Sequence, residues 1–190
     1  MSTDFLIVGL GNPGPEYART RHNLGAMALS ACADAWNFPP FRKRFEGLFV
    51  QSSLDGCEVA LLFPQTYMNL SGRSVGAAMR SLSIARERIL VLHDDVDLPF
   101  GRIRVKMGGG HGGHNGLKSI VACIGGPEFI RVRLGVGRPA GDDMVDHVLS
   151  PFFSEEKQEL PKILEKSVEI VKTILNEGPT YAMNAFNGKA

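Results

Sequence analysis

The sequence is poor in the features that mark secreted and membrane proteins. Its three cysteines, Cys32, Cys57 and Cys123, are odd in number, far apart and outside any C-x-x-C spacing, so we expect reduced, mostly buried thiols. No apolar run approaches the roughly 18 residues of a membrane span, and the first residues show no basic segment followed by a long apolar one. These absences predict a cytoplasmic protein that does not cross a membrane.

An excess of charge of one sign is also absent. Lys and Arg total 21 and Asp and Glu total 20, which leaves a net charge of +1. The net charge is therefore too small to attract a polyanion, and any contact with nucleic acid needs a local basic patch. With 44% hydrophobic and 22% charged residues, the 190-residue chain has the composition of an ordinary globular protein, and we expect one domain over residues 1–190.

Apolar runs of strand length alternate with helical patterns along the chain. The expected strands are Phe5–Gly9, Leu48–Gln51, Val59–Phe63, Ile89–His93, Ile103–Met107 and Phe129–Val136. The expected helices are Leu24–Trp36, Ser71–Leu82, Asn115–Ile124 and Ser154–Asn176, the last ending at Gly178-Pro179 and kinked or delayed in its start by Pro161. This interleaving favours an α/β fold, with a mixed, mostly parallel sheet between helices, because Leu54-Asp55-Gly56 predicts an antiparallel hairpin.

The stretch Phe5–Gly25 places one histidine, His22, on a Gly/Pro-rich loop after a strand, which suits a titratable group above a sheet edge. The spacing of glycines in 9–14 also fits a dinucleotide-binding fingerprint. That alternative needs a helix that opens on the glycines and an acidic residue at the end of a second strand. Here the helical pattern begins near Leu24 and the acid would be Asp34, inside a helix, so the alternative is disfavoured.

Ser74 lies in the pattern G-R-S-V-G, which matches the nucleophile elbow of serine hydrolases. An elbow needs a strand that runs straight into its first glycine. Residues 64–71 separate the expected strand from Gly72, so we interpret these small residues as a surface for close helix packing.

Glycine is concentrated in residues 108–116, G-G-G-H-G-G-H-N-G. A phosphate cradle is one interpretation, although lysine does not follow the last glycine as in the Walker pattern. A metal site at His111 and His114 is another, without a further ligand at convincing spacing. The third is a flexible lid whose tip, His114-Asn115, caps the next helix and borders a pocket. The sequence does not choose between them.

Two carboxylates, Asp94 and Asp95, end the strand that begins at Ile89. The carboxyl ends of strands border the binding crevice of an open α/β sheet, so Asp94 is a candidate to accept a hydrogen bond from His22, which would fix its tautomer and raise its basicity. A loop-capping role is the simpler alternative. The amides of Asn12 and Asn69 suit ester hydrolysis, since each can donate to a carbonyl oxygen, but for Asn69 a helix cap is the simpler interpretation.

Arg102, Arg104 and Lys106 alternate with apolar residues along one expected strand, and Arg131 and Arg133 repeat the pattern on another. Alternation places the cations of a strand on one face about 7 Å apart, close to the spacing of backbone phosphates. A solvated sheet face is the usual explanation. Two such stripes in a chain of near-zero net charge favour a track for a polyanion.

Taken together, five blocks of sequence resemble the bacterial peptidyl-tRNA hydrolases. They are G-L-G-N-P-G-x-x-Y, T-R-H-N-L-G, P-Q-T-Y-M-N-L-S-G, H-D-D-x-D-L-P-F-G and G-G-G-H-G-G-H-N-G-L. The resemblance covers nearly the whole chain, from Phe5 to about Pro151. It implies a monomeric, metal-independent cytoplasmic esterase without a cofactor that cleaves the ester between a peptide and the 3′ ribose of tRNA.

The resemblance also implies roles for individual residues. His22 would be the catalytic base and Asp94 its partner, while Asn12, Asn69 and Asn115 would bind the substrate or the transition state. The same channel would be lined by Tyr17, Met68 and His114, and tRNA phosphates would meet Arg104, Lys106 and Arg133. Arg104 stands where family members often carry lysine, which keeps the charge.

One mechanism joins these observations as a hypothesis. Neutral His22 takes a proton from water as the water attacks the ester carbonyl, Asn69 and a backbone amide stabilise the oxyanion, and His22 then protonates the departing ribose oxygen. No serine or cysteine nucleophile is needed. A non-enzymatic RNA-binding module is the alternative from another class, since it needs the basic stripes but not the histidine.

Overall fold

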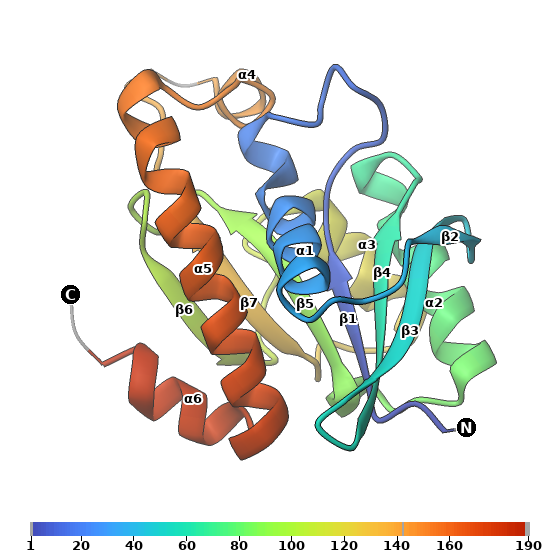
Figure 1. Cartoon of the computed structure of the whole chain (residues 1–190). Helices are drawn as coiled ribbons and strands as arrows, with labels where there is room; N and C mark the ends of the chain where they lie inside the picture. The colour runs from blue at the N-terminus through green and yellow to red at the C-terminus, as the bar shows by residue number, and fades with distance from the viewer. Residues whose placement is uncertain (1, 142, 189–190) are drawn as a thin grey trace.

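The computed structural model describes residues 2–141 and 143–188 and contains a 7-stranded sheet in the order β2-β3-β4-β1-β5-β7-β6 (Figure 1). The strands are β1 Phe5–Gly9, β2 Arg42–Arg44, β3 Gly47–Leu54, β4 Cys57–Pro64, β5 Ile89–Asp95, β6 Ile103–Met107 and β7 Ile130–Gly135. The central strands β4, β1, β5 and β7 are parallel to one another. Strand β3 pairs antiparallel with β4, β2 with β3, and β6 with β7. The expected mixed sheet with a parallel core is confirmed.

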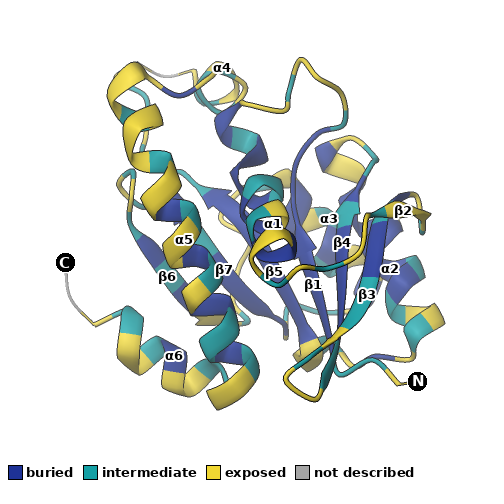
Figure 2. Ribbon diagram, in the orientation of Figure 1, coloured by how far each residue is buried: buried dark blue, intermediate teal, exposed yellow. Residues whose placement is uncertain are grey.

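Helices cover both faces of this sheet. They are α1 Leu24–Ala35, α2 Ser71–Leu82, α3 Asn115–Ile124, α4 Met144–Val148, α5 Ser154–Glu177 and α6 Pro179–Phe186, with 3-10 turns η1 Arg21–Asn23, η2 Met68–Leu70 and η3 Arg86–Arg88. Helices α1, α5 and α6 lie on the face nearer the viewer in Figure 1, and α2 and α3 lie behind it. Each face has its own apolar core, and the central strands between them are buried (Figure 2). Within the described residues, no helix combines the length and apolar character needed to span a membrane.

Local chemistry explains the hairpin and the close pairing of α2 with α3. Asp55 and Gly56, both with positive φ, form a two-residue turn between β3 and β4, as expected. A Cβ atom on Gly72 would lie 2.1 Å from the carbonyl oxygen of Ser119, so only glycine permits this approach of the helices. Ser74 lies completely buried within α2, which confirms the packing interpretation and leaves the nucleophile elbow without support.

Three elements differ from expectation. The strand β2 and the helices α4 and α6 were not predicted. The helix α5 ends at Glu177, directly before Gly178, as expected, and Pro179 then begins the unexpected α6. Proline suits the first turn of a helix, where its missing N–H is no loss. The start of α5 is not delayed by Pro161, which lies inside the helix.

Candidate active site

The close approach of α1 to β5 brings His22 above the end of the sheet. A Cβ atom on Gly25 would lie 2.2 Å from the carbonyl oxygen of Leu92, so glycine lets the start of α1 press against β5. The backbone N–H of Leu10 donates to that same oxygen at 3.1 Å, which ties the loop after β1 to β5. The 3-10 turn η1, directly before α1, therefore carries His22 to the carboxyl end of β5.

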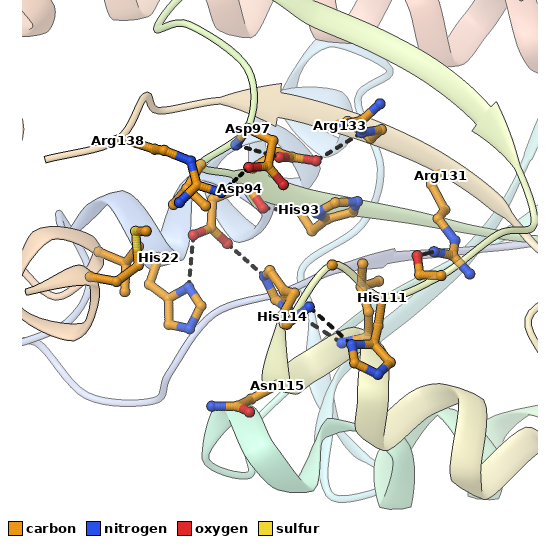
Figure 3. A pocket seen from close by; sticks show the side chains of 18 of the residues that line it. His22, His93, Asp94, Asp97, His111, His114, Asn115, Arg131, Arg133 and Arg138 are labelled. Atoms are coloured by element: carbon orange, nitrogen blue, oxygen red, sulfur yellow. Dashed lines mark hydrogen bonds and ion pairs between the residues drawn. The ribbon is translucent and has the colours of Figure 1, made fainter. Parts of the chain in front are cut away.

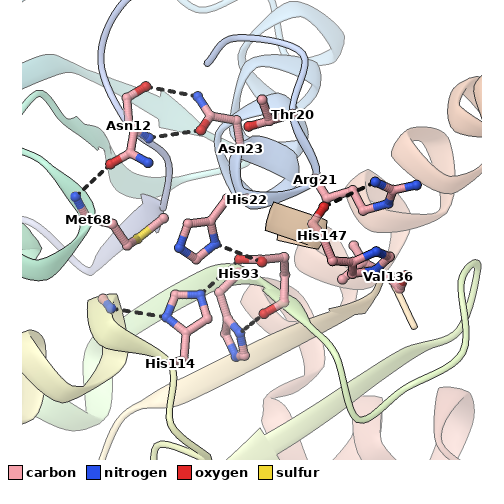
Figure 4. Close-up of polar contacts among 12 residues, drawn as sticks. Asn12, Thr20, Arg21, His22, Asn23, Met68, His93, His114, Val136 and His147 are labelled. Atoms are coloured by element: carbon pink, nitrogen blue, oxygen red, sulfur yellow. Dashed lines mark hydrogen bonds and ion pairs between the residues drawn. The ribbon is translucent and has the colours of Figure 1, made fainter. Parts of the chain in front are cut away.

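Asp94, at this end of β5, is shared by two histidines. His22 Nδ1 lies 2.8 Å from Asp94 Oδ2, and His114 Nε2 lies 2.8 Å from Asp94 Oδ1 (Figures 3 and 4). Burial raises the pKa of the Asp94 carboxyl, but the two histidines outweigh this effect and hold the pKa well below its usual range. Asp94 is therefore an ionised acceptor for both rings. The structure brings His22 and Asp94 together as the sequence predicts, and it adds His114.

The helix α3 sets the tautomer of His114. His114 is the N-cap of α3, and its Nδ1 accepts from the backbone N–H groups of Gly116 at 3.1 Å and Leu117 at 3.3 Å. Since those amides only donate, the ring proton must lie on Nε2, which donates to Asp94. His22 donates to the same carboxylate through Nδ1, so in its neutral form Nε2 carries the free lone pair. This nitrogen points away from Asp94 in Figure 3.

A third histidine, His93, supports Asp94 from within the sheet, and sequence reasoning did not assign it a role. Its buried ring donates through Nδ1 to the backbone carbonyl of Asp94 at 2.8 Å. The ring meets His114 edge-on, with centroids 5.2 Å apart. Burial, followed by repulsion from His114, lowers the pKa of His93 to about 4. The sequence does contain a signal that could have identified His93, because it is a polar residue in an otherwise apolar strand and directly precedes the candidate acid Asp94.

The side chain of Asn12 is fixed beside His22. Its Oδ1 accepts from the backbone N–H of Met68 at 2.7 Å, so Nδ2 is the group left to donate (Figure 4). Asn23 clamps the backbone of Asn12, because its Oδ1 accepts from Asn12 N and its Nδ2 donates to Asn12 O, each at 2.9 Å. Asn23 was not among the expected site residues. It holds the loop after β1 against the start of α1.

The other residues expected in the channel occupy different depths. Asn69 and Asn115 are exposed, and Asn115 lines the cavity described below. Met68 is buried beneath the site, where its sulfur packs against the α3 residue Gly116. Tyr17 is partly exposed in the loop after β1, and its carbonyl oxygen accepts from Thr20. Their contacts with substrate remain predictions.

A cavity of about 570 Å³ opens beside His22, bounded by Asp94, His114 and the glycine-rich segment (Figure 3). Its wall also contains residues of both charges and an apolar side from α4: Asp95, Asp97, Lys106, Arg131, Arg133, Arg138, Met144, Val145 and Val148. The volume falls in the range of small-ligand sites in proteins. The cavity therefore offers a reacting centre at one end and cations farther along.

The two basic stripes lie on the antiparallel strands β6 and β7. Arg104 pairs in register with Arg133, and Lys106 pairs with Arg131. Arg133 Nε lies 2.8 Å from Asp95 Oδ2, and the Lys106 side chain is exposed. Arg104, Lys106 and Arg133 thus share one face of β6 and β7, as expected for a polyanion track.

Arg131 requires a correction, because the expected stripe places it on the exposed track. It is buried, and its guanidinium donates to the carbonyl oxygens of Gly109, at 2.8 Å, and Gly110. Arg131 therefore anchors the first part of the glycine-rich segment. Positive φ angles at Gly109, Gly112 and Gly113 explain why that segment needs glycine.

A metal site was one interpretation of His111 and His114. The structure instead places ligand atoms of His22, Asp94 and His114 within 4.8 Å of one another, and His111 accepts through Nδ1 from the N–H of Gly113. A metal-bound histidine normally donates from its other nitrogen. The Nδ1 atom of His114 instead accepts from two amides, so the geometry suits a hydrogen-bonded carboxylate better than a metal centre.

Comparisons with known proteins agree with this arrangement. The sequence matches the family profile described as peptidyl-tRNA hydrolase over residues 6–190. It is 50% identical to the peptidyl-tRNA hydrolase of Syntrophotalea carbinolica, over 97% of each chain, and 48% identical to that of Geobacter sulfurreducens, over 97% of this chain and 95% of the relative. The crystal structure of peptidyl-tRNA hydrolase from Acinetobacter baumannii is 43% identical with a TM-score of 0.91, covering 99% of this chain and 96% of that one.

Proposed function

Because the chain belongs to the peptidyl-tRNA hydrolase family and hydrolyses the ester bond of peptidyl-tRNA, we propose that His22, oriented by Asp94, activates the water that attacks this ester. One observation carries the assignment: His22 Nδ1 is engaged with Asp94 at 2.8 Å, while the ring borders an open cavity. A histidine held in this way keeps Nε2 available to accept a proton.

The reaction needs two proton transfers, and His22 is suited to both. Nε2 accepts a proton from water as the water oxygen bonds to the ester carbonyl carbon. The ionised Asp94 stabilises the imidazolium that forms, as in other histidine-carboxylate pairs. The tetrahedral intermediate then collapses, the bond to the 3′ ribose oxygen breaks, and Nε2–H donates its proton to that oxygen. The products are tRNA with a 3′ hydroxyl group and the free peptide, whose new carboxylic acid releases its proton to solvent and becomes a carboxylate.

Asn12 is our candidate donor to the developing oxyanion. Its carbonyl oxygen accepts from the N–H of Met68, which fixes the orientation of the amide and leaves the amide nitrogen as the donor on a side chain beside His22 (Figure 4). An oriented donor of this kind contributes roughly 3 kcal/mol to lowering the barrier. Asn69 and Asn115, which are exposed, are better placed to contact the peptide. This changes the initial hypothesis, in which Asn69 was the oxyanion donor.

The tRNA part of the substrate is assigned to the basic face of β6 and β7. Arg104, Lys106 and Arg133 share this face, and the last two also line the cavity that reaches His22. Cations at strand spacing match successive phosphates, and the acceptor end would place its 3′ ribose beside His22. A monomeric, cytoplasmic enzyme remains our expectation.

Two assays test this function. The protein should release the acyl group from N-acetyl-aminoacyl-tRNA and leave free aminoacyl-tRNA largely intact. A single turnover in H₂¹⁸O should place the label in the released carboxylate and none in the 3′ hydroxyl of tRNA. Binding of tRNA without any release would support the RNA-binding alternative. Trapping of an acyl-enzyme would overturn direct attack by water.

A further inference from the structure

Arg21, the residue before His22, is unusual because it is a nearly completely buried cation. Its side chain is 1% exposed. Nη1 donates to the carbonyl oxygen of His147 at 3.1 Å, and Nη2 lies 3.0 Å from Glu156 Oε1. The guanidinium also lies over the ring of Phe153, 4.7 Å from its centroid. A buried charge is retained only with such partners, since its desolvation is costly.

The backbone around Arg21 is attached to the same distant segment. The N–H of Arg21 donates to the carbonyl oxygen of Ser150 at 3.1 Å, and Thr20 forms an isolated antiparallel bridge with Pro151. The Arg21 side chain, the Arg21 N–H and the bridge at Thr20 therefore all reach residues 147–156. This segment connects α4 to the first turn of α5.

The turn that carries His22 is tied to the loop after β1 by Asn23 at its end, but it has no side-chain cap at its start. It is the three-residue 3-10 turn η1, whose N-cap Thr20 makes no side-chain capping bond. The His22 ring is tied to its surroundings through one hydrogen bond, to Asp94. In Figure 4 the Arg21 and His22 side chains point to opposite sides of the turn. Arg21 reaches the carbonyl oxygen of His147, whereas His22 reaches Asp94. The position of the His22 backbone therefore depends on what holds Arg21 at the start of the turn, as well as on Asn23 at its end.

We propose that Arg21 and Glu156 form a positioning pair for His22, which fixes the turn from the side opposite Asp94. Neither side chain touches the reacting atoms. The pair acts through the His22 backbone, which must stay in place for Nε2 to face the attacking water, since small displacements of a reacting group are costly in rate. This inference rests on the proposed role of His22 as the base.

The same contact links the reacting centre to the cavity wall. His147 belongs to α4, and the α4 residues Met144, Val145 and Val148 line the cavity. The His147 ring in turn lies 3.0 Å, through Nε2, from the carbonyl oxygen of Gly137, just after β7. Three elements therefore meet at the Arg21 guanidinium: the turn that carries His22, the helix α4 in the cavity wall, and the start of α5.

The shape of the guanidinium explains why arginine is required. Its two partners, the carbonyl of His147 and the carboxylate of Glu156, are met by different nitrogens of one planar fork. A lysine at position 21 can satisfy one partner at a time and cannot hold both. Glu156 also supports the start of α5, since the same Oε1 accepts from the N–H of the N-cap residue Phe153 at 2.8 Å.

The test compares steady-state kinetics of four variants after wild-type hydrolysis of N-acetyl-aminoacyl-tRNA has been established. Arg21→Lys and Glu156→Ala should each lower kcat by about tenfold or more, with KM changed by less than about threefold. Glu156→Gln keeps an acceptor oxygen for both donors and should restore kcat to within about threefold of wild type. Glu155→Ala removes the adjacent, exposed acid of α5 and serves as the matched control, with no effect expected.

An NMR signal separates positioning from general stability. The ¹H signal of the His22 Nδ1–H proton, which lies in the hydrogen bond to Asp94, should lose intensity or change its chemical shift in Arg21→Lys and Glu156→Ala. In Glu156→Gln the signal should be retained. Ile174→Ala, a core truncation in α5, should lower the melting temperature without altering this signal or kcat. Folded Arg21→Lys and Glu156→Ala proteins with wild-type kcat would overturn the inference, as would an equal loss of kcat in Ile174→Ala. An inactive wild type would instead refute the proposed function.

Discussion

The turn η1 and the N-terminus of α3 each bring one histidine to the same carboxylate, yet only one of these histidines is suited to act as a base. His22 and His114 both lie 2.8 Å from Asp94, and their side chains are similarly accessible, 13% and 11% exposed. They differ at the second ring nitrogen. In His114 that nitrogen caps α3, whereas in His22 it borders the cavity. The partner of the distal nitrogen, more than the distance to the acid, decides which ring can accept a proton.

The largest effect should come from removing His22. The variant His22→Ala loses the proton acceptor while Asp94 keeps His114, so we expect kcat to fall about 10²- to 10⁴-fold with an intact fold. Single-turnover hydrolysis of N-acetyl-aminoacyl-tRNA measures this. Wild-type turnover by His22→Ala would refute its assignment as the base.

Removing the shared acid should cost less. In Asp94→Ala the His22 ring remains but loses its orienting acceptor and the charge that stabilises its protonated form, so we expect a loss of roughly tenfold to hundredfold in kcat. The same assay compares the two variants. A larger loss in Asp94→Ala than in His22→Ala would show that Asp94 has a more direct role than orientation.

The third histidine should make stability depend on pH. The pKa of buried His93 lies near 4, below its ordinary value of 6.5, so between these values the unfolded chain binds a proton that the folded chain does not. The free energy of unfolding should therefore decrease as pH falls from 6.5 toward 4, by about 2 kcal/mol between pH 7.5 and pH 5. Urea unfolding at both values measures the decrease. His93→Gln, which can still donate to the Asp94 carbonyl, should reduce it, and an unchanged slope would show that His93 is not responsible.

The comparison between the two histidines can be sharpened with His114→Asn. Asparagine is a good N-cap, so α3 should retain its stability to within about 1 kcal/mol, whereas Asp94 loses one donor. We expect kcat to fall by less than about tenfold, far less than in His22→Ala. Thermal unfolding and the hydrolysis assay measure the two effects separately. A loss equal to that of His22→Ala would show that the two rings act as one unit.

The smallest effect should appear on the basic face of β6 and β7. Lys106→Ala should raise KM a few-fold with little change in kcat. The slope of log KM against log salt concentration should decrease by about the amount expected for the loss of one phosphate contact. Kinetics at several salt concentrations give this slope. Lys166→Ala, on α5 and paired with Glu169, is the control, for which we expect an unchanged slope. Equal slopes for Lys106→Ala and wild type would exclude this lysine from phosphate binding.

Much of the fold could be predicted because apolar periodicity is a local signal. Residues Ser71–Leu82, Asn115–Ile124 and Ile103–Met107 form the expected elements at the expected bounds. The strand β2 was missed because it consists of three exposed cations, Arg42 to Arg44, without an apolar residue to reveal it. The strand β2 forms because it hydrogen-bonds to β3, and no local sequence pattern predicts that pairing.

The site was predictable where it depends on strand ends and not where it depends on packing. Asp94 could be placed near His22 because both follow parallel strands at one edge of the sheet. The capping of α3 by His114 requires the position of a helix relative to β5, and the burial of Arg131 requires the position of the glycine-rich segment over β7. Period-two alternation assigns Arg131 and Arg133 to one face but cannot tell which of them is covered.

The ring nitrogens of the two histidines provide the most direct test. In ¹⁵N NMR of the uniformly labelled protein, the neutral form of His22 should carry its proton on Nδ1 and the neutral form of His114 should carry it on Nε2. These opposite tautomers would support the claim that His22 Nε2 is available to accept a proton, whereas His114 Nδ1 already accepts hydrogen bonds from the α3 amides. A proton on Nε2 of His22, or the same tautomer in both rings, would contradict the account.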